Sequence, residues 1–109
     1  MNFKVLTIPP FDKQLKRLVK KYPSLKIEFE DLVIGLKQHP QQGTAIGIDC
    51  YKIRLAIASK GKGKRGGSRI ITHIVITNKT VYLLTIYDKS EKDDLTDQEL
   101  NELLTFVND

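Results

Sequence analysis

The spacing of apolar residues changes once along this chain, and that change limits the folds available to it. Over roughly the first 40 residues, apolar side chains recur every three to four positions, which is the period of an amphipathic α-helix. From Tyr51 onward they alternate with other residues, which is the period of a β-strand with one buried face. Helices followed by strands predict an α+β protein in which the two kinds of element pack as layers.

Two helices are expected before the change in period. Pro9-Pro10 ends a short first strand, FKVLTI, and Asp12 stands where an N-cap carboxylate would accept backbone N–H groups of the first helix. Pro23 ends that helix, and Ser24 is placed to cap the second. So short a break predicts an αα-hairpin. The outer face of the first helix is expected to be basic, through Lys13, Lys16, Arg17, Lys20 and Lys21.

Three strands are expected after the change, at residues 51–58, 69–77 and 81–87, and the stretch QQGTAIGID before them is expected to be a loop. Thr96 and the acidic residues after it predict the start of a short C-terminal helix. The predicted fold is therefore an N-terminal strand and an αα-hairpin packed on an antiparallel β-sheet meander, followed by that helix. The length of 109 residues predicts a single domain, residues 1–109.

A glycine-rich basic loop, SKGKGKRGGSR at residues 59–69, separates the first two of these strands. Its letters GKGKRG match the GxGxxG pattern, but a strand follows where a dinucleotide-binding motif or a P-loop needs a helix. No small-molecule cofactor is therefore expected. The chain carries a net charge of +5, and the stretch from Lys52 to Arg69 has seven basic residues and no acidic one. A segment of this kind attracts polyanions.

The basic loop has two interpretations. Glycines let a backbone follow a phosphate chain, while lysine and arginine neutralise it. Alternatively, the loop is solvated and its charges only keep a sheet edge soluble. The first interpretation is favoured, because Lys52, Arg54 and Arg69 extend the charge onto strands, where rigid placement adds nothing to solubility. The residues expected to bind RNA are Lys52, Lys60, Lys62, Lys64 and Arg65.

Several classes of protein are disfavoured by the composition. The apolar runs are well short of the ~20 residues that cross a bilayer, and the first residues do not resemble a secretory signal. The single cysteine, Cys50, has no partner for a disulfide or a zinc site, which is typical of a chain made for a reducing cytoplasm. The carboxylates of Glu91, Asp93 and Asp94 are interpreted as the approach to a helix N-terminus, so no metal is expected.

Two stretches carry a resemblance that spans nearly the whole chain. KRGGSR, residues 64–69, is followed at a distance by YDKSEKDDLT, residues 87–96, after a strand and a pair of helices. This layout resembles the RelE toxin superfamily of bacterial toxin–antitoxin modules, and within it the HigB-like branch. The resemblance implies a metal-independent endoribonuclease that cleaves mRNA and inhibits translation. It also implies mRNA and the ribosome as partners and a neutralising antitoxin protein, and these agree with the cytoplasmic location expected from the single cysteine.

Site residues follow from this resemblance position by position. Arg69 falls where the family has an arginine that holds the scissile phosphate, and Lys52 and Arg54 fall where members have basic residues one strand away. Lys89 matches a cationic residue at the end of the last strand that assists phosphate or leaving-group chemistry. Some members complete the catalytic set with a tyrosine in the C-terminal segment. Here that segment reads DLTD, and Tyr87 is the nearest substitute.

Alternation along the strands adds one further candidate. If the ladder is regular, Arg69 and His73 share one side of their strand, and the odd-numbered residues from 81 to 89 share one side of the next. His73 is therefore a candidate catalytic acid or base, although a histidine in an isoleucine-rich strand is also typical of a packed residue. Tyr87 has alternatives as well, as a stacking platform for a base or as a core residue.

Two other functions stay open on the sequence. The same fold is shared by ParE-type gyrase poisons, which lack the basic catalytic set and bind a protein target. Arg69 together with Lys89 favours the nuclease over this class. The other alternative is a non-catalytic module that binds RNA or the ribosome without cutting.

Overall fold

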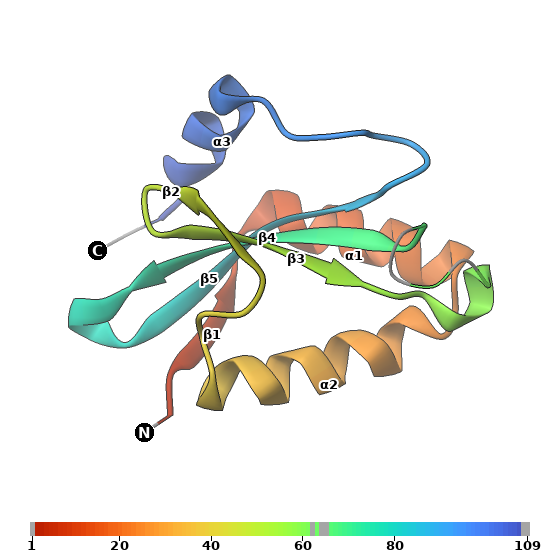
Figure 1. Ribbon diagram of the computed structural model, residues 1–109, viewed down its shortest axis with the longest axis horizontal. Coiled ribbons are helices and arrows are strands. Elements are labelled where there is room, and N and C mark those ends of the chain that lie inside the picture. The colour runs from red at the N-terminus through yellow and green to blue at the C-terminus, as the bar shows by residue number, and fades with distance from the viewer. Residues whose placement is uncertain (1, 62, 64–65, 108–109) are drawn as a thin grey trace.

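The computed structural model describes residues 2–61, 63 and 66–107 of the chain. Helices and strands follow one another in the order β1, α1, α2, β2, β3, β4, β5, α3 (Figure 1). Their bounds are Lys4–Thr7 for β1, Pro9–Lys21 for α1, Leu25–Gln38 for α2, Thr44–Gly47 for β2, Cys50–Leu55 for β3, Ser68–Val75 for β4, Thr80–Asp88 for β5 and Asp97–Leu104 for α3. Within the described residues, no helix is long and apolar enough to cross a membrane.

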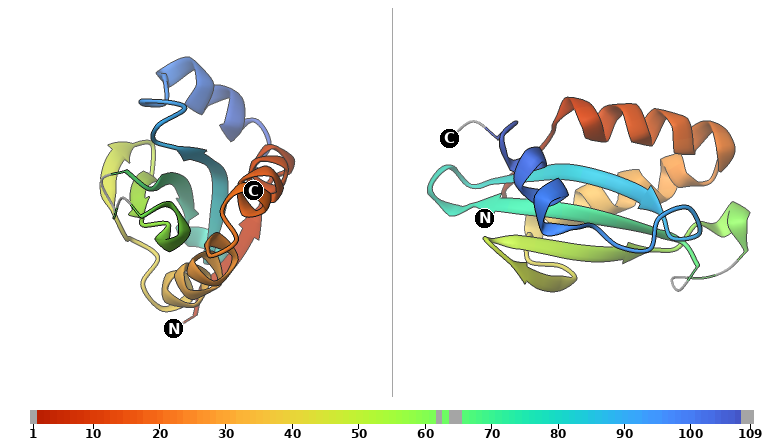
Figure 2. Two further views of the ribbon diagram at one scale, coloured as in Figure 1. Left: turned by 90° about the vertical axis from the view of Figure 1, so that its right-hand side faces the viewer. Right: turned by 90° about the horizontal axis from the view of Figure 1, so that it is seen from above.

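A five-stranded mixed sheet forms the centre of the molecule. Its strand order is β1-β5-β4-β3-β2, with β1 parallel to β5 and the other neighbouring pairs antiparallel. Helices α1 and α2 cover one face, while α3 and the segment before it lie over the other (Figure 2). The expected α+β fold, with an N-terminal strand, an αα-hairpin on the sheet and a short C-terminal helix, is confirmed.

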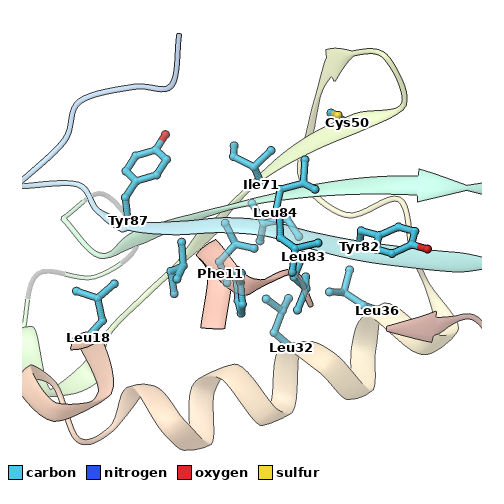
Figure 3. Close-up of a cluster of buried hydrophobic side chains, with 14 of the residues drawn as sticks. Phe11, Leu18, Leu32, Leu36, Cys50, Ile71, Tyr82, Leu83, Leu84 and Tyr87 are labelled. Carbon is cyan, nitrogen blue, oxygen red and sulfur yellow. The ribbon is translucent and has the colours of Figure 1, made fainter. Parts of the chain in front are cut away.

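The main core lies between this sheet and the helical hairpin. Phe11 and Leu18 of α1, Leu36 of α2 and Ile70 of β4 are completely buried. Figure 3 shows the three helical side chains on one side of the sheet and Tyr87 pointing to the other. Tyr87 lies opposite Arg69 of β4, and adjacent strand residues point to opposite faces, so Ile70 points to the helical side of the sheet.

The stretch expected to be a loop before β3 contains strand β2, which pairs antiparallel with β3. In the turn between them, Ile48 and Asp49 both lie in the left-handed region, with φ of 52° and 55°. Hairpin turns of this kind favour asparagine and glycine, and a β-branched residue there is an outlier. The sequence did not predict this hairpin because an isoleucine occupies the first central turn position, where asparagine, aspartate or glycine normally indicates a two-residue turn.

The first helix begins before the residue expected to cap it. α1 starts at Pro9 with Ile8 in the N-cap position, and Asp12 lies in the first turn. Proline suits the first helical positions because they need no backbone donor. The acidic residue still complements the positive end of the helix dipole, so only its position relative to the start was wrong.

The N-terminus of α2 holds the base of the basic loop. Ser24 is the N-cap residue, as expected, but its hydroxyl makes no capping bond. Instead it lies 2.8 Å from the Ser59 hydroxyl and accepts the Ser59 backbone N–H at 2.9 Å. The Glu28 carboxylate accepts the backbone N–H of Ala58 at 2.7 Å. These bonds fix the short 3₁₀ turn at Ala58–Lys60 against the helical hairpin.

Helix α3 begins with the capping box that its sequence predicts. The backbone N–H of Glu99 donates to the Thr96 hydroxyl at 3.1 Å, and the backbone N–H of Thr96 donates to the Glu99 carboxylate at 2.9 Å. Two backbone donors that the helix itself leaves unpaired are satisfied in this way. The start of the C-terminal helix is therefore confirmed.

One irregularity in the β4–β5 ladder changes which side chains share a face. The register shifts between Ile71 and Thr72, so that one extra residue of β5 is accommodated. An extra residue reverses the alternation beyond it. The expectation that the odd-numbered residues from 81 to 89 share one side is therefore wrong. Tyr82, not a residue of that odd-numbered set, lies opposite His73.

The position of the core leads to a first prediction. Leu18→Ala should lower the free energy of unfolding by about 2–5 kcal/mol, because it leaves a cavity between α1 and the sheet. The matched variant Ile27→Ala removes a side chain that is exposed on α2 and should change stability by less than about 0.5 kcal/mol. Urea denaturation followed by circular dichroism measures both. Equal losses in the two variants would contradict this assignment of the core.

Candidate functional site

Three side chains form one row across the sheet. In register, Arg54 of β3 lies opposite Arg69 of β4, and Arg69 lies opposite Tyr87 of β5. Residues directly opposite each other on neighbouring strands project to the same face. Because Tyr87 points away from the helical side chains, this Arg54–Arg69–Tyr87 row faces the other side of the sheet, where α3 lies (Figure 3). The structure therefore brings together three residues expected from the sequence.

The row places two guanidinium-bearing residues side by side. Like charges directly opposite each other on neighbouring strands destabilise a sheet. Arg54 is exposed, whereas Arg69 is only 5% exposed and its Nη1 donates to the carbonyl oxygen of Ser68 at 3.2 Å. Guanidinium groups match the geometry of phosphate oxygens. A pair of arginines held together by the sheet is therefore suited to a phosphate group.

Tyr87 completes the row. Its side chain is buried, and no partner meets the hydrogen-bond geometry of its hydroxyl among the residues that the structure describes, although the Asp94 carboxylate is near enough to affect its pKa. Burial raises the pKa of Tyr87 to about 12; the Asp94 carboxylate also raises this pKa, and Arg69 lowers it. The phenol is therefore protonated at neutral pH, and its hydroxyl can donate a hydrogen bond or a proton.

Two lysines flank the row. The backbone N–H of Lys89 donates to the Gly67 carbonyl at 3.0 Å, which extends the β4–β5 ladder by one pair. Alternation then puts Lys89 on the same face as Tyr87. Lys52 lies two residues before Arg54 in β3, also on that face. We call Lys52, Arg54, Arg69 and Lys89 the basic patch.

Residues 89–96, which connect β5 to α3, lie over the same face of the sheet (Figure 1). We call residues 90–96 of this connection the acidic segment, because Lys89 belongs to the basic patch. The Asp93 carboxylate lies 2.7 Å from the Lys89 ammonium, and the Asp94 carboxylate lies 3.4 Å from the Lys52 ammonium. The hydrogen bond from Lys89 lowers the pKa of Asp93, and a backbone hydrogen bond from Leu95, together with Lys52, lowers the pKa of Asp94. Both carboxylates are therefore ionised at neutral pH.

Glu91 ties the acidic segment to the helical hairpin. Its carboxylate lies 2.8 Å from the Arg17 guanidinium and 3.3 Å from the Lys21 ammonium, both on α1. A cleft of about 700 Å³ lies between α1 and α3 next to this contact, and Tyr87 is part of its lining. Apolar side chains at its α3 end include Phe106, which is partly exposed. The row is therefore bordered by a cleft that can accept more than a single phosphate.

A buried ion pair anchors the base of the basic loop. The Lys60 ammonium pairs with the Asp88 carboxylate, and both side chains are almost fully buried. The Tyr22 hydroxyl donates to the same carboxylate at 2.8 Å, and the backbone N–H and hydroxyl of Ser90 donate to it at 2.9 and 2.8 Å. Sequence reasoning missed this network, because Lys60 and Tyr22 lie 28 and 66 residues from Asp88.

The expected RNA-binding residues fall into three groups. Lys52 belongs to the basic patch and is partly exposed. Lys60 is bound by Asp88, so it holds the loop in the free protein, and its contact with RNA stays a prediction. Lys62, Lys64 and Arg65 lie outside the described residues, and the contacts expected of them also stay predictions.

The structure does not bring His73 to the row. It lies four residues from Arg69 along β4, about 13 Å at the rise of a strand. Its Nδ1 is 3.0 Å from the Ile48 carbonyl oxygen and 3.5 Å from the Cys50 sulfur. Burial and the Asp49 charge raise the pKa of the Cys50 thiol to about 11, so this thiol is not a nucleophile at neutral pH. Both side chains support the strained turn after β2.

A metal ion finds no ready site in the part of the chain that the structure describes. No group of three histidine, cysteine, aspartate or glutamate side chains is arranged there to hold one. The carboxylates of the acidic segment are instead bound by lysines and arginine. The metal independence expected from the sequence stays a prediction.

The Asp88 network leads to a second prediction. Burial alone would raise the pKa of Asp88, but the bonds from Lys60, Ser90 and Tyr22 outweigh it and hold the pKa well below its usual value. This contribution to stability is therefore present above the unfolded pKa of about 4 and is lost as the pH falls below it. Asp88→Asn should lower the free energy of unfolding at pH 7 by about 3 kcal/mol, because it leaves the Lys60 charge buried without its partner.

Urea titrations at pH 7 and at several pH values below 5 test this prediction. Asp88→Asn should weaken the dependence of stability on pH by about one proton. Asp31→Asn, on the exposed surface of α2, is the matched control and should behave like the unmodified protein. An Asp88→Asn variant with unchanged stability at pH 7 would show that the ion pair does not anchor the loop.

Comparisons with known proteins agree with this architecture. A family model described as the RelE toxin of the RelE/RelB toxin–antitoxin system matches residues 12–108. A mutant of the Escherichia coli toxin RelE in the free state has 14% identity and a TM-score of 0.66, covering 99% of this chain and 100% of that one. The toxin–antitoxin complex RelBE2 of Mycobacterium tuberculosis gives 16% identity and a TM-score of 0.55, covering 81% and 99%. A conserved hypothetical protein of Helicobacter pylori gives 21% identity and 0.54, covering 82% and 97%.

Proposed function

Because this chain belongs to the RelE toxin family of the RelE/RelB toxin–antitoxin system, we propose that it is an endoribonuclease that cleaves mRNA and thereby inhibits translation. The observation that carries the proposal is the register of β3, β4 and β5, which aligns Arg54, Arg69 and Tyr87 on one face. Two guanidinium groups can bind and neutralise a phosphate, and a tyrosine hydroxyl can donate a proton. These are the groups needed for a reaction in which RNA supplies its own nucleophile.

The proposed reaction is an internal transfer at phosphorus. The ribose 2′-OH attacks the adjacent phosphorus while the bond to the 5′ oxygen of the next nucleotide breaks. The products are a 2′,3′-cyclic phosphate and a free 5′-OH, with the proton lost by the 2′-OH balanced by the proton gained by the leaving oxygen. The protein has to orient the strand, neutralise the extra negative charge of the transition state and assist the two proton transfers. None of these tasks requires a metal ion.

The basic patch suits the phosphate part of this task. Arg69 lies at the centre of the row and is held rigidly by burial, so we assign it to the scissile phosphate. Arg54 is exposed beside it and can bind the same phosphate or the next one. Lys52 and Lys89 flank the row and are assigned to neighbouring phosphates of the strand.

Tyr87 suits the protonation of the leaving oxygen. A phenol with a raised pKa is a poor base but keeps its proton until a negative oxygen forms next to it. The ring is also large enough to stack on a base, which needs no hydroxyl. His73 is not part of this assignment, because its ring nitrogen contacts the turn after β2.

The proposal includes the partners implied by such an activity. A free nuclease of this kind would halt its host, so we propose an antitoxin that binds and neutralises it. The structure from Mycobacterium tuberculosis, which is similar in fold, is a toxin–antitoxin complex. We further propose that the protein acts in the cytoplasm, where mRNA and ribosomes are found, and that it belongs to the HigB-like branch of the family.

The central prediction concerns the two arginines. Arg54→Ala and Arg69→Lys should each lower the rate of mRNA cleavage by about 100-fold, because a missing or misplaced donor no longer stabilises the transition state. Lys20→Ala removes an exposed charge from α1 and should leave the rate unchanged. Mapping of cleavage sites on a defined mRNA, with and without ribosomes, measures all three variants.

The same assay separates the proposed nuclease from its alternatives. Cleavage that is unaffected by both arginine substitutions would contradict the assignment of the row. Inhibition of DNA gyrase with intact mRNA would favour a ParE-type toxin. RNA binding without cleavage, even on ribosomes, would leave a binding module only.

A further prediction separates the two roles of Tyr87. Tyr87→Phe removes a buried hydroxyl that has no partner among the described residues, so the free energy of unfolding should stay the same or rise slightly. If the hydroxyl protonates the leaving oxygen, cleavage falls by about 100-fold or more. Full cleavage by Tyr87→Phe together with loss in Tyr87→Ala would instead assign the ring to stacking.

A further inference from the structure

The carboxylates of the acidic segment are more exposed to solvent than the lysines of the basic patch that they bind. The side chain of Asp93 is 97% exposed, whereas that of Lys89 beneath it is 32% exposed. Asp94 is likewise more exposed than its partner Lys52, at 65% against 31%. An RNA strand that approaches this face therefore encounters two carboxylates before it reaches the ammonium groups.

We propose that the carboxylates of Asp93 and Asp94 are an internal competitor of RNA. In the free protein they bind the ammonium groups of Lys89 and Lys52, and a phosphate backbone displaces them when RNA binds. Carboxylates and phosphodiesters are both anions that bind the same ammonium groups. The inference rests on the proposed function in that it requires RNA to bind the basic patch. It does not require that RNA is cut.

Burial of the central row supports displacement of the segment. Arg69 and Tyr87 are only 5% and 6% exposed, so a phosphate cannot reach them while the face is covered. The buried hydroxyl of Tyr87 has no partner among the described residues. Tyr87 and Leu95 of the acidic segment line the same cleft. Movement of the segment would expose an arginine and a hydrogen-bond donor together.

The ion pairs of Asp93 and Asp94 are weak enough to be displaced, while Glu91 keeps its pairs with α1. The pairs of Asp93 with Lys89 and of Asp94 with Lys52 have at least one largely exposed member. Exposed pairs of this kind typically shift an equilibrium by less than about fivefold each, and salt screens them further. A strand that places several phosphates on the patch at once can therefore outcompete two carboxylates.

The double variant Asp93→Asn/Asp94→Asn tests this inference in the full chain. Both substitutions keep the shape of the side chain and an oxygen that can accept the Leu95 backbone N–H, now 2.8 Å from Asp94, so folding should be preserved. The probe is a short fluorescent single-stranded RNA with 2′-O-methyl groups, which keeps its phosphates but has no nucleophile. We expect it to bind the double variant about three- to tenfold more tightly than the unmodified protein at physiological salt.

A charge-matched control separates local competition from a general increase in positive charge. Glu30→Gln/Asp31→Asn removes the same two charges from the exposed surface of α2, on the opposite face of the molecule. Its affinity for the probe should change by less than about twofold, because charges beyond a Debye length of ~8 Å are largely screened. As a second measurement, deuterium uptake by residues 89–96 of the unmodified protein should rise when RNA is added.

The outcomes distinguish this inference from the proposed function. Equal gains of affinity in the two double variants, slower exchange of residues 89–96 on RNA binding, or no binding of the probe would each overturn the internal competitor. Tighter binding by Asp93→Asn/Asp94→Asn alone supports it, even if no RNA is ever cut and the nuclease assignment fails.

Discussion

The pairing of β4 with both of its neighbours is the constraint on which the candidate site depends. Ile70 is buried against the helical hairpin, so a slip of one residue would move an arginine into an apolar core. With this slip excluded, Arg69 has to lie between Arg54 and Tyr87 on the open face. Apolar burial on the other side of the same strand therefore holds the two arginines next to each other, and their like charges favour the binding of an anion.

The sequence predicted the parts of this arrangement that depend on periodicity. Alternation placed Arg54 and Arg69 on strands next to the basic loop, and the capping box located the start of α3. Features that depend on single departures from periodicity were missed. The two central turn positions, Ile48 and Asp49, hold neither glycine nor asparagine, and no residue type in the sequence marks the extra residue in β5. The Asp88 network could not be predicted either, because Lys60 and Tyr22 lie far from Asp88 in the sequence and no motif links them.

Charge was also distributed differently from what the sequence implies. The chain is basic between Lys52 and Arg69 and mostly acidic after Asp88, which as a linear pattern indicates two separate surfaces or a rim. Folding instead lays the acidic segment on the basic patch, where Asp93 pairs with Lys89 and Asp94 pairs with Lys52. A net charge of +5 therefore overstates how strongly the free protein attracts RNA at this face.

The extra residue in β5 has a consequence for comparing this toxin with its relatives. It divides the strand into two stretches whose inward and outward positions are out of phase. A relative whose strand lacks the extra residue would need a one-residue gap at this point for both halves of β5 to align. Without the gap, an alignment that matches Tyr87 would pair the N-terminal half of β5 with residues that point to the opposite face of the sheet. With identities of 14–21% to the similar structures, gap placement by strand geometry is a safer guide there than residue type.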